Sequence, residues 1–535
     1  MSKKIRDPIY DYILIEDEFL PIINSVEFQR LRNIIQTSYT STYPSALHNR
    51  FTHSLGVFWL GNIAFDFLIK NSPDKVKSLT KKDIADTKRT FIMACLCHDL
   101  GHSPFSHTGE KFYDAPKISK ELTDSISNKA YKTDVKSEKS IVGKEHEIMS
   151  ALLAIKRFGS YIPDHSFFAR CIIGLKYGSI QNVTKTERKR VSIYQSCIEL
   201  LNSSVIDVDK LDYLIRDSYM SGYSSIVIDY KRLLGGIFIN EGPHPIGYEK
   251  SSLSVLENVL TAHDIERRWV QSHPVIQYEG YLLQTIIREL NFIYNYESEK
   301  IFSYNAITVD GIQLQDIGTI RLLSDADVLF LAKKHYDTSD AVKEYCDRRL
   351  RRHPIWKSEA EFSSLFDFKT NDTFIKILMK WETMLSQGQY GVYSLNNTFY
   401  NHLKEDYSRL QKEYDSITSN SKKATIKSNL DTLRIEIQIL TQIKDYLDEN
   451  KILFDLVIVT QEQFKSGLYK PRFQELPIRF DHNPNRISPM KEVSPVPFDL
   501  IKDDKKTFFY LYYKRSNFEL DAVEFSKVIR KAAII

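Results

Sequence analysis

Glycine and proline are scarce in this sequence, with 19 and 17 residues in a chain of 535. Their scarcity accompanies an apolar spacing that is typical of helices along much of the chain. No run approaches the roughly 18 apolar residues of a spanning helix, so we expect no membrane partner. The first residues, MSKKIRDPIYDYILIEDEF, carry acidic side chains early and lack the apolar segment of a secretory signal. A reducing cytoplasm is the simplest location for such a chain.

Cysteine is also rare, and the five cysteines are an odd number scattered along the chain. Cys95 and Cys97 lack the CxxC spacing of a zinc or redox motif, so we expect both to be small core residues of an apolar helix. The formal net charge of +4 is too small to predict nucleic-acid binding by itself. Nucleic acid is therefore expected to be a secondary partner at most.

The chain is too long for one compact core, so we expect two or three lobes. Residues 1–300 are predicted to form a helical core, and residues 301–535 a smaller lobe that is helical and α+β. Apolar periodicity in the core predicts helices at 55–70, 87–100, 146–158, 192–202, 206–218, 252–271 and 278–296. The predicted fold class is therefore mainly α.

The second lobe is expected to contain a helical hairpin and two strands. The apolar spacing over about 400–448 is not a sustained heptad, which favours a hairpin of helices over a coiled coil. Aromatic and β-branched residues predict strands at 451–460 and 507–514. The prolines between these strands predict an irregular loop. They are Pro484, Pro489, Pro495 and Pro497.

Residues 111–145 interrupt the helical pattern of the core. The stretch KISKELTDSISNKAYKTDVKSEKS is rich in Lys, Ser and Asp and has few large apolar residues. This composition predicts a surface insertion or a mobile lid. Its place between Glu110 and His146 suggests that it gates a pocket or meets a partner.

Polar residues that carry chemistry gather in FIMACLCHDLGHSPFSHTGE, residues 91–110, where they follow an apolar run. Burying so many polar groups is costly unless they are paired or bound to a metal. Two further segments are of the same kind: HNRFTHSLGV (48–57) and IDVDKLDYLIRDSY (206–219). Combined, the three segments offer a ligand set of His53, His98, Asp99 and Asp209.

Two imidazoles and two carboxylates suit a divalent ion such as Mn²⁺, Fe²⁺, Zn²⁺ or Mg²⁺. Each residue also has an ordinary interpretation. His53 alone would be a capping or core histidine, and Asp209 alone a solvated helix carboxylate. The residues by themselves leave both interpretations open.

The same segments resemble the HD-domain superfamily, in its deoxynucleoside triphosphate triphosphohydrolase branch. The resemblance rests on FQRLRNIIQ (28–36), HNRFTHSLGV, HDLGHSPFSH (98–107), EHE (145–147) and DVDKLDYLIRD (207–217). It covers about residues 3 to 220, thins towards 300 and returns weakly at ILFDLVIVTQEQFKSGLYK. It implies an all-helical HD-domain core.

The resemblance implies that water attacks the α-phosphorus of a dNTP, giving a deoxynucleoside and inorganic triphosphate. One divalent metal ion per site would be held by the ligand set His53, His98, Asp99 and Asp209. His102 and His146 correspond to the family's catalytic pair of histidines, and Glu110 stands where the family usually has Asp. The ordinary alternative for His146 is a helix cap or a surface residue.

The resemblance also implies a set of substrate-binding residues. Those expected at the phosphates are Arg50, His107 and Lys210. Those expected at the sugar are Gln36, Tyr213 and Asp217, with Gln36 at the 3′-hydroxyl. Thr37 replaces a bulkier apolar residue, so the exclusion of ribose is less secure. The alternative for His107 is a hydrogen bond within its turn, and His48 is expected to fix a loop rather than bind metal.

Family members are often activated by Mg-bound nucleotides between subunits, so the resemblance implies a homo-oligomer, either a dimer or a tetramer. The candidate regulatory residues are Lys3, Lys4, Arg6, Asn24, Gln29 and Arg32. Asn24 stands in place of an aspartate that reads guanine, and an amide cannot accept two N–H bonds as a carboxylate does. We therefore expect an activating nucleotide other than guanine, such as a thymine nucleotide. The alternative is that Arg30 and Arg32 form surface ion pairs.

Three functions remain in competition. The first is a metal-dependent dNTP triphosphohydrolase, acting in dNTP pool control or in antiviral or antiphage depletion of dNTPs. The second is an HD phosphodiesterase or nucleotidase that acts on another phosphate ester. The third is a non-catalytic nucleotide sensor.

Overall fold

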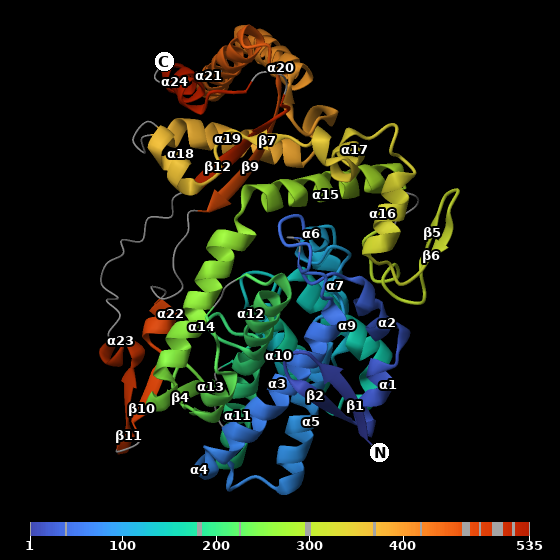
Figure 1. Cartoon of the computed structure of the whole chain (residues 1–535), viewed down its shortest axis with the longest axis vertical. Helices are drawn as coiled ribbons and strands as arrows, with labels where there is room; N and C mark the ends of the chain where they lie inside the picture. The colour runs from blue at the N-terminus through green and yellow to red at the C-terminus, as the bar shows by residue number, and fades with distance from the viewer. Residues whose placement is uncertain are drawn as a thin grey trace. The chain divides into compact units, whose positions relative to one another are not determined.

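The computed structural model (Figure 1) describes most of the chain. The described residues are 2–37, 40–178, 184–223, 226–294, 301–366, 371–417, 420–462, 471–480, 483–494, 507–515 and 519–533. They divide into two compact units. The first contains Met1–Val270, Ile287–Lys334 and Lys465–Lys502, and the second contains Gln271–Ile286, His335–Phe464 and Asp503–Ile535. The boundary expected at residue 300 therefore falls inside the first unit.

Six helices build the core of the first unit. They are α3 (Arg50–Lys70), α5 (Lys81–Cys97), α9 (Glu145–Phe158), α10 (His165–Ile173), α11 (Lys185–Leu201) and α12 (Val208–Ser221). Helix α3 is central because it is apolar nearly all round, and it packs against both α5 and α12 (Figure 1). The helices predicted from periodicity are all present, with starts shifted by a few residues.

Caps decide where the helices that carry the motif residues begin. The Asn49 side chain accepts the Thr52 N–H at the start of α3, and Asp207 accepts the Lys210 N–H at the start of α12. Thr80 and Asp83 form a capping box on α5. These starts place the first turns of α3 and α12 at His53 and Asp209.

Residues 111–145 fold as two helices, α7 (Ala115–Ser125) and α8 (Lys129–Ser137). The few apolar side chains of α7, Ile118 and Leu122, are buried, and α7 packs against α9. The guanidinium of fully buried Arg170 lies 2.5 Å from Asp134 of α8. The segment is polar in composition, but its apolar residues lie at helical spacing, which composition alone does not reveal.

Three small sheets lie in the described part of the first unit, and one of them pairs β5 (Ile312–Leu314) with β6 (Gly318–Ile320). Strands β1 (Ser2–Asp7) and β2 (Asp11–Glu16) pair antiparallel. A four-stranded sheet has the order β11 (Asn483–Pro489), β10 (Pro477–Phe480), β4 (Ile246–Glu249) and β3 (Ile237–Ile239). Pro484 and Pro489 thus lie in a strand, where we expected an irregular loop. An edge strand tolerates proline because one side of it needs no ladder bonds. Pro495 and Pro497 lie outside the described residues.

The first unit also contains short or peripheral elements. They are α1 (Leu20–Ile23), α2 (Val26–Arg30), α4 (Pro73–Val76), α6 (His107–Glu110), α13 (Tyr230–Gly235), α14 (Leu253–Ile265), the π-helix Glu266–Gln271, β5 (Ile312–Leu314), β6 (Gly318–Ile320), α16 (Asp325–Lys333), α22 (Pro471–Gln474) and α23 (Met490–Val493). Helix α15 (Pro274–Ile293) begins in the second unit and ends in the first.

The second unit combines helices with a small sheet. Helices α20 (Asn397–Ser416) and α21 (Asn420–Glu449) pack as the predicted hairpin. The sheet has the order β7 (His353–Pro354), β12 (Thr507–Tyr513), β9 (Asp455–Glu462) and β8 (Leu395–Asn396). The other helices are α17 (Asp340–Cys346), α18 (Glu359–Leu365), α19 (Asn371–Ser386) and α24 (Ala522–Ala533).

The predicted fold class, mainly α with a smaller α+β part, is confirmed. A search of the described helices for a membrane-crossing segment finds none with the required length and apolar character.

Candidate active site

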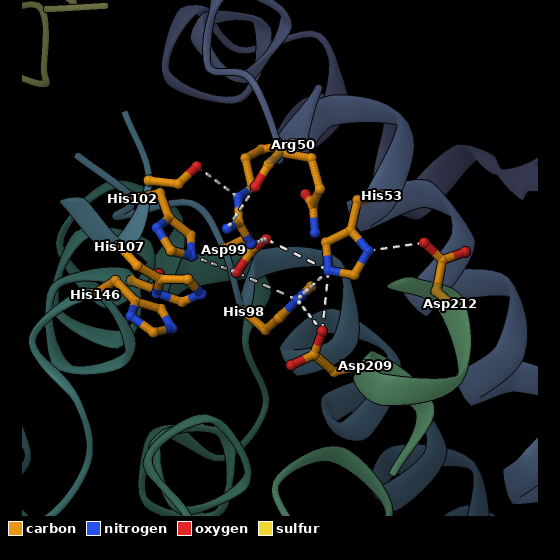
Figure 2. A network of polar contacts seen from close by, with 12 residues as sticks. Arg50, His53, His98, Asp99, His102, His107, His146, Asp209 and Asp212 are labelled. Atoms are coloured by element: carbon orange, nitrogen blue, oxygen red, sulfur yellow. Dashed lines mark hydrogen bonds and ion pairs between the residues drawn. The ribbon is translucent and has the colours of Figure 1, made fainter. Parts of the chain in front are cut away.

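The four predicted metal ligands gather at one point of the first unit (Figure 2). The Nε2 atoms of His53 and His98 lie 3.2 Å apart. Asp209 Oδ1 lies 3.0 Å from the first and 3.7 Å from the second, and these three residues could hold a metal ion. Asp99 joins them, with one oxygen 3.5 Å from His53 Nε2 and the other 3.3 Å from His98 Nε2.

Hydrogen bonds at the Nδ1 atoms of the two imidazoles leave their Nε2 atoms available as metal ligands. His98 Nδ1 lies 2.9 Å from the Cys95 carbonyl, and His53 Nδ1 lies 2.7 Å from Asp212 Oδ2. A carbonyl only accepts, and the Arg216 guanidinium helps to hold the pKa of buried Asp212 low, at about 2, so both Nδ1 atoms donate. In neutral rings the Nε2 lone pairs then face each other.

Two facing lone pairs repel unless a proton or a cation lies between them. Neighbouring ligands of an octahedral ion with bonds of about 2.1 Å are about 3.0 Å apart, close to the observed 3.2 Å. Burial alone would lower the pKa of His53, but Asp209, Asp212 and Asp99 outweigh it and raise the pKa to about 10. The site attracts positive charge, and its donors fit a divalent ion.

A second cluster contains His102, His107, Glu110 and His146. The rings of His102 and His146 stack with centroids 4.0 Å apart. Glu110 accepts from His146 Nδ1 through one oxygen and lies 3.1 Å from His107 Nδ1 through the other. Although burial opposes it, these two histidines hold the pKa of Glu110 far below its usual range. The longer Glu side chain therefore reaches His146, and the cluster could itself hold a metal ion.

His102 is fully buried, and neither ring nitrogen makes a hydrogen bond within the described part of the chain. Its Nε2 lies 3.1 Å from Asp99 Oδ1, without hydrogen-bond geometry. Burial, the Arg50 guanidinium and His146 hold the pKa of His102 well below its usual range. A buried imidazole with two unused nitrogens is suited to a partner that the chain itself does not supply.

Arg50 links the metal-ligand cluster to the loop that follows His102. Its guanidinium lies 2.7 Å from Asp99 Oδ2, donates to Ser106 Oγ at 3.1 Å and donates to the Gln36 carbonyl at 3.3 Å. The side-chain oxygen of buried Gln36 has no hydrogen-bond partner among the described residues. Both residues were predicted to bind substrate, and both lie beside the ligand cluster.

Three other predicted substrate residues, Lys210, Tyr213 and Asp217, lie on α12, and His107 lies on α6. Asp209, half-buried Tyr213 and Asp217 share one face of the helix. Asp217 Oδ1 is 2.7 Å from His48 Nε2, so His48 holds this face rather than the metal-ligand cluster. The Lys210 ammonium donates to Asp207 and to the Ser203 carbonyl. His107 is exposed and bonds within its turn to Glu110.

Two residues of the site were missed by the sequence analysis. Asp212, which orients His53, lies three positions after Asp209 and could have been found from helical spacing. For Arg30 a surface ion pair was the alternative considered, but Arg30 is buried and donates to the His102 carbonyl at 2.6 Å. Nothing local in the sequence shows this burial, because the groups that cover Arg30 are distant along the chain.

The predicted regulatory residues lie in and after the N-terminal hairpin. Lys3 and Lys4 are exposed on β1, and Arg6 pairs with Asp11. Asn24 is exposed at the end of α1. Gln29 donates to the Ile23 carbonyl at 2.7 Å and accepts from Arg32, whose guanidinium lies over the Phe51 ring. Their role in nucleotide binding stays a prediction.

The sequence is similar to several known proteins. No family model matches the chain. An uncharacterized protein of Methanocaldococcus jannaschii is 30% identical over 292 residues, which is 54% of this chain and 50% of that protein. The deoxynucleoside triphosphate triphosphohydrolase SAMHD1 homolog of Dictyostelium discoideum is 33% identical over 236 residues, which is 44% and 39% respectively. The matched stretches thus span half or less of these relatives.

The solved structures extend the likeness along the whole chain. The crystal structure of a phosphohydrolase from Bacteroides thetaiotaomicron aligns with a TM-score of 0.54 and 17% identity. The alignment covers 96% of this chain and 100% of that one. At this identity the likeness concerns the fold alone.

Proposed function

We propose that the chain is a metal-dependent dNTP triphosphohydrolase, and its similarity to the SAMHD1 homolog of Dictyostelium discoideum supports this. One observation carries the proposal. Asp99 lies between the two clusters, with the same oxygen 3.3 Å from His98 Nε2 and 3.1 Å from His102 Nε2. A metal-binding group and a buried imidazole therefore adjoin one carboxylate, which places a metal ion and a general acid side by side for cleavage of a phosphate ester.

A divalent ion would be held by His53, His98, Asp99 and Asp209, and when bound it would polarise a phosphate oxygen and acidify water. The remaining work falls to the chain. A bond forms between the water oxygen and the α-phosphorus, and the bond from that phosphorus to the 5′-oxygen breaks. His102 is the group we propose to give its proton to the 5′-oxygen, because an alkoxide is a poor leaving group.

The charges around His102 set the condition for this proton transfer. Arg50 and burial keep the free imidazole neutral. A triphosphate brings several negative charges, so its binding beside Arg50 would favour the protonated ring. Glu110 fixes His146, and the stacked His146 ring in turn fixes the plane of His102.

The finer parts of the proposal rest on the resemblance. Arg50, His107 and Lys210 would contact the phosphates, and Gln36, Tyr213 and Asp217 the sugar. Lys210 would have to leave Asp207 to do so. An activating nucleotide would bind at the N-terminal hairpin of a homo-oligomer, and Asn24 would disfavour guanine there. GTP as the best sole activator would contradict this last point.

A second candidate function is hydrolysis of another phosphate ester. The observation in its favour is the second group of possible metal ligands, formed by His102, His107, Glu110 and His146. Two neighbouring ions would suit a phosphodiesterase, in which both the attacking and the leaving oxygens are stabilised by metal.

Product analysis separates these functions. The protein is incubated with Mn²⁺ or Mg²⁺ and the four dNTPs, singly and mixed, and products are separated by ion exchange. Inorganic triphosphate with a deoxynucleoside supports the proposal, whereas monophosphate with pyrophosphate contradicts it. Asp209→Asn should abolish turnover, and the matched control Asp66→Asn, which removes an exposed carboxylate paired with Lys88, should not.

A further inference from the structure

The first turn of α16 is distant in sequence from the motifs, but it contacts the loop that follows His102. Asp325 is buried at the start of α16, and its two carboxylate oxygens have different targets. Oδ1 accepts the Phe105 N–H at 2.7 Å, and Oδ2 accepts the Ile35 N–H at 2.9 Å. One carboxylate thus joins the backbone of the loop after His102 to the backbone beside Gln36.

Arg30 makes a second link between the segment just before α16 and the same loop. Its Nη1 donates to the Leu323 carbonyl at 2.8 Å. Its Nη2 donates to the carbonyls of His102 at 2.6 Å and Leu100 at 3.2 Å. Asp325 therefore binds one N–H of the loop, and Arg30 binds two of its carbonyls. Both side chains are buried.

The loop needs such support because its backbone is strained. Phe105 and Ser106 have φ angles of 58° and 52°, in the left-handed region that side chains other than glycine rarely adopt. Such conformations persist only where the surroundings determine them. The strained Ser106 places its hydroxyl so that it donates to the Ile35 carbonyl at 2.6 Å and accepts from Arg50 Nε at 3.1 Å.

We propose that Asp325 is a positioning residue for the active site. By fixing Phe105 and Ile35, it sets the place of the Ser106 hydroxyl and, through it, of the Arg50 guanidinium beside Asp99. Asp325 touches neither substrate nor metal in this proposal. The consequence for catalysis rests on the proposed function, whereas the consequence for the two backbone N–H groups does not.

The same helix supplies a matched control. Asp327 caps α16 by accepting from the N–H and hydroxyl of Ser324, and no contact of its carboxylate with the His102 loop is found among the described residues. Asp325→Asn and Asp327→Asn each remove one carboxylate from the first turn of α16. Only Asp325→Asn places an amide NH₂ against a backbone N–H of the loop or of Ile35.

The first measurement is amide hydrogen exchange of the full chain, resolved at Ile35 and Phe105. Exchange at one or both should be about tenfold faster in Asp325→Asn and unchanged in Asp327→Asn, since an accepting carboxylate protects the N–H. Unchanged exchange in Asp325→Asn, or equal acceleration in both variants, would overturn the proposal. A wild-type chain without dNTP turnover would contradict the proposed function and leave this result intact.

The second measurement is kinetic. Asp325→Asn should lower kcat by about 10- to 100-fold, the scale of a small misplacement of catalytic groups. Its affinity for Mn²⁺ without nucleotide should stay within about twofold, because the loop does not carry the metal ligands. If Asp325→Asn does not fold, Ser106→Ala takes its place, since it removes only the hydroxyl between Ile35 and Arg50. An unchanged kcat in the folded variant would overturn the positioning role.

Discussion

The Nε2 atoms of His53 and His98 lie 3.2 Å apart although the Nδ1 of each ring is already bonded to a protein oxygen. The two rings come from different helices, α3 and the end of α5, so the approach is a product of helix packing. Three carboxylates surround the pair. The chain therefore concentrates negative charge at a point where two neutral donors converge, which is the condition for binding a divalent cation.

Asp212 should tune the metal site without touching the metal. Replacing the group that holds a ligating histidine typically weakens metal affinity by about 10- to 100-fold. We expect that loss for Asp212→Asn, measured by calorimetric titration with Mn²⁺. Asp66→Asn on the exposed side of α3 is the control and should bind Mn²⁺ like the wild type. Equal Mn²⁺ affinities in the two variants would show that Asp212 does not support the metal site.

Gly56 should be irreplaceable, although alanine normally suits a helix better. A Cβ at Gly56 would overlap Asp212 Oδ1 and lie 2.6 Å from Arg216 Nη2. Gly56→Ala should therefore destabilise the fold and displace Asp212 from His53. Gly280→Ala in α15, where a Cβ meets nothing within 4 Å, should instead stabilise by about 0.5–1 kcal/mol. Urea unfolding of both variants checks the opposite signs, and a gain in both would contradict the close packing at Gly56.

Arg170 should hold the 111–145 segment in place. Asp134 is partly exposed, so its charge stays in reach of water, and the loss of the charged hydrogen bonds of buried Arg170 costs about 2 kcal/mol. We expect Arg170→Met to lose about that much in urea unfolding and to become sensitive to protease within 111–145. Arg190→Met breaks a more exposed pair with Asp83 and should lose about 1 kcal/mol or less. Similar losses in both would show that the Arg170–Asp134 contact does not fix the segment.

Asp325 should make the free energy of unfolding depend on pH. Burial raises its pKa from 3.8 to about 6, against the bonds from Ile35 and Phe105 and the charges of Arg30 and Arg50 that face it. Because the folded chain holds this proton more tightly, the free energy of unfolding should fall as pH rises from about 4 to about 6. The contribution corresponds to about 3 kcal/mol.

The comparison with Asp325→Asn isolates this contribution. Urea unfolding at pH 4.5, 5.5 and 7 should show the wild type losing stability relative to the variant as pH rises. Other titrating groups are common to both proteins and cancel. A difference that stays constant over this range would mean that Asp325 titrates as an ordinary carboxyl.

Much of the fold could be predicted because helical periodicity is local. The apolar spacing in 55–70 is enough to predict most of α3. The strands at 451–460 and 507–514 were predicted from another local signal, their aromatic and β-branched residues. The 111–145 segment was harder, since its helices depend on a few apolar residues that become buried only against α9. The strand at Pro484 was missed because edge strands tolerate a residue that sequence patterns treat as a breaker.

The sequence by itself determined the inventory of the site: the types, order and spacing of its histidines and carboxylates, and the helix starts that carry them. Only the tertiary structure decided which polar groups share a buried space. Arg30 contacts Leu323, and Asp325 contacts Ile35, across nearly 300 residues. Periodicity describes which face of an element is apolar, but hydrogen bonds between distant elements follow from how those elements pack, and no local pattern encodes that.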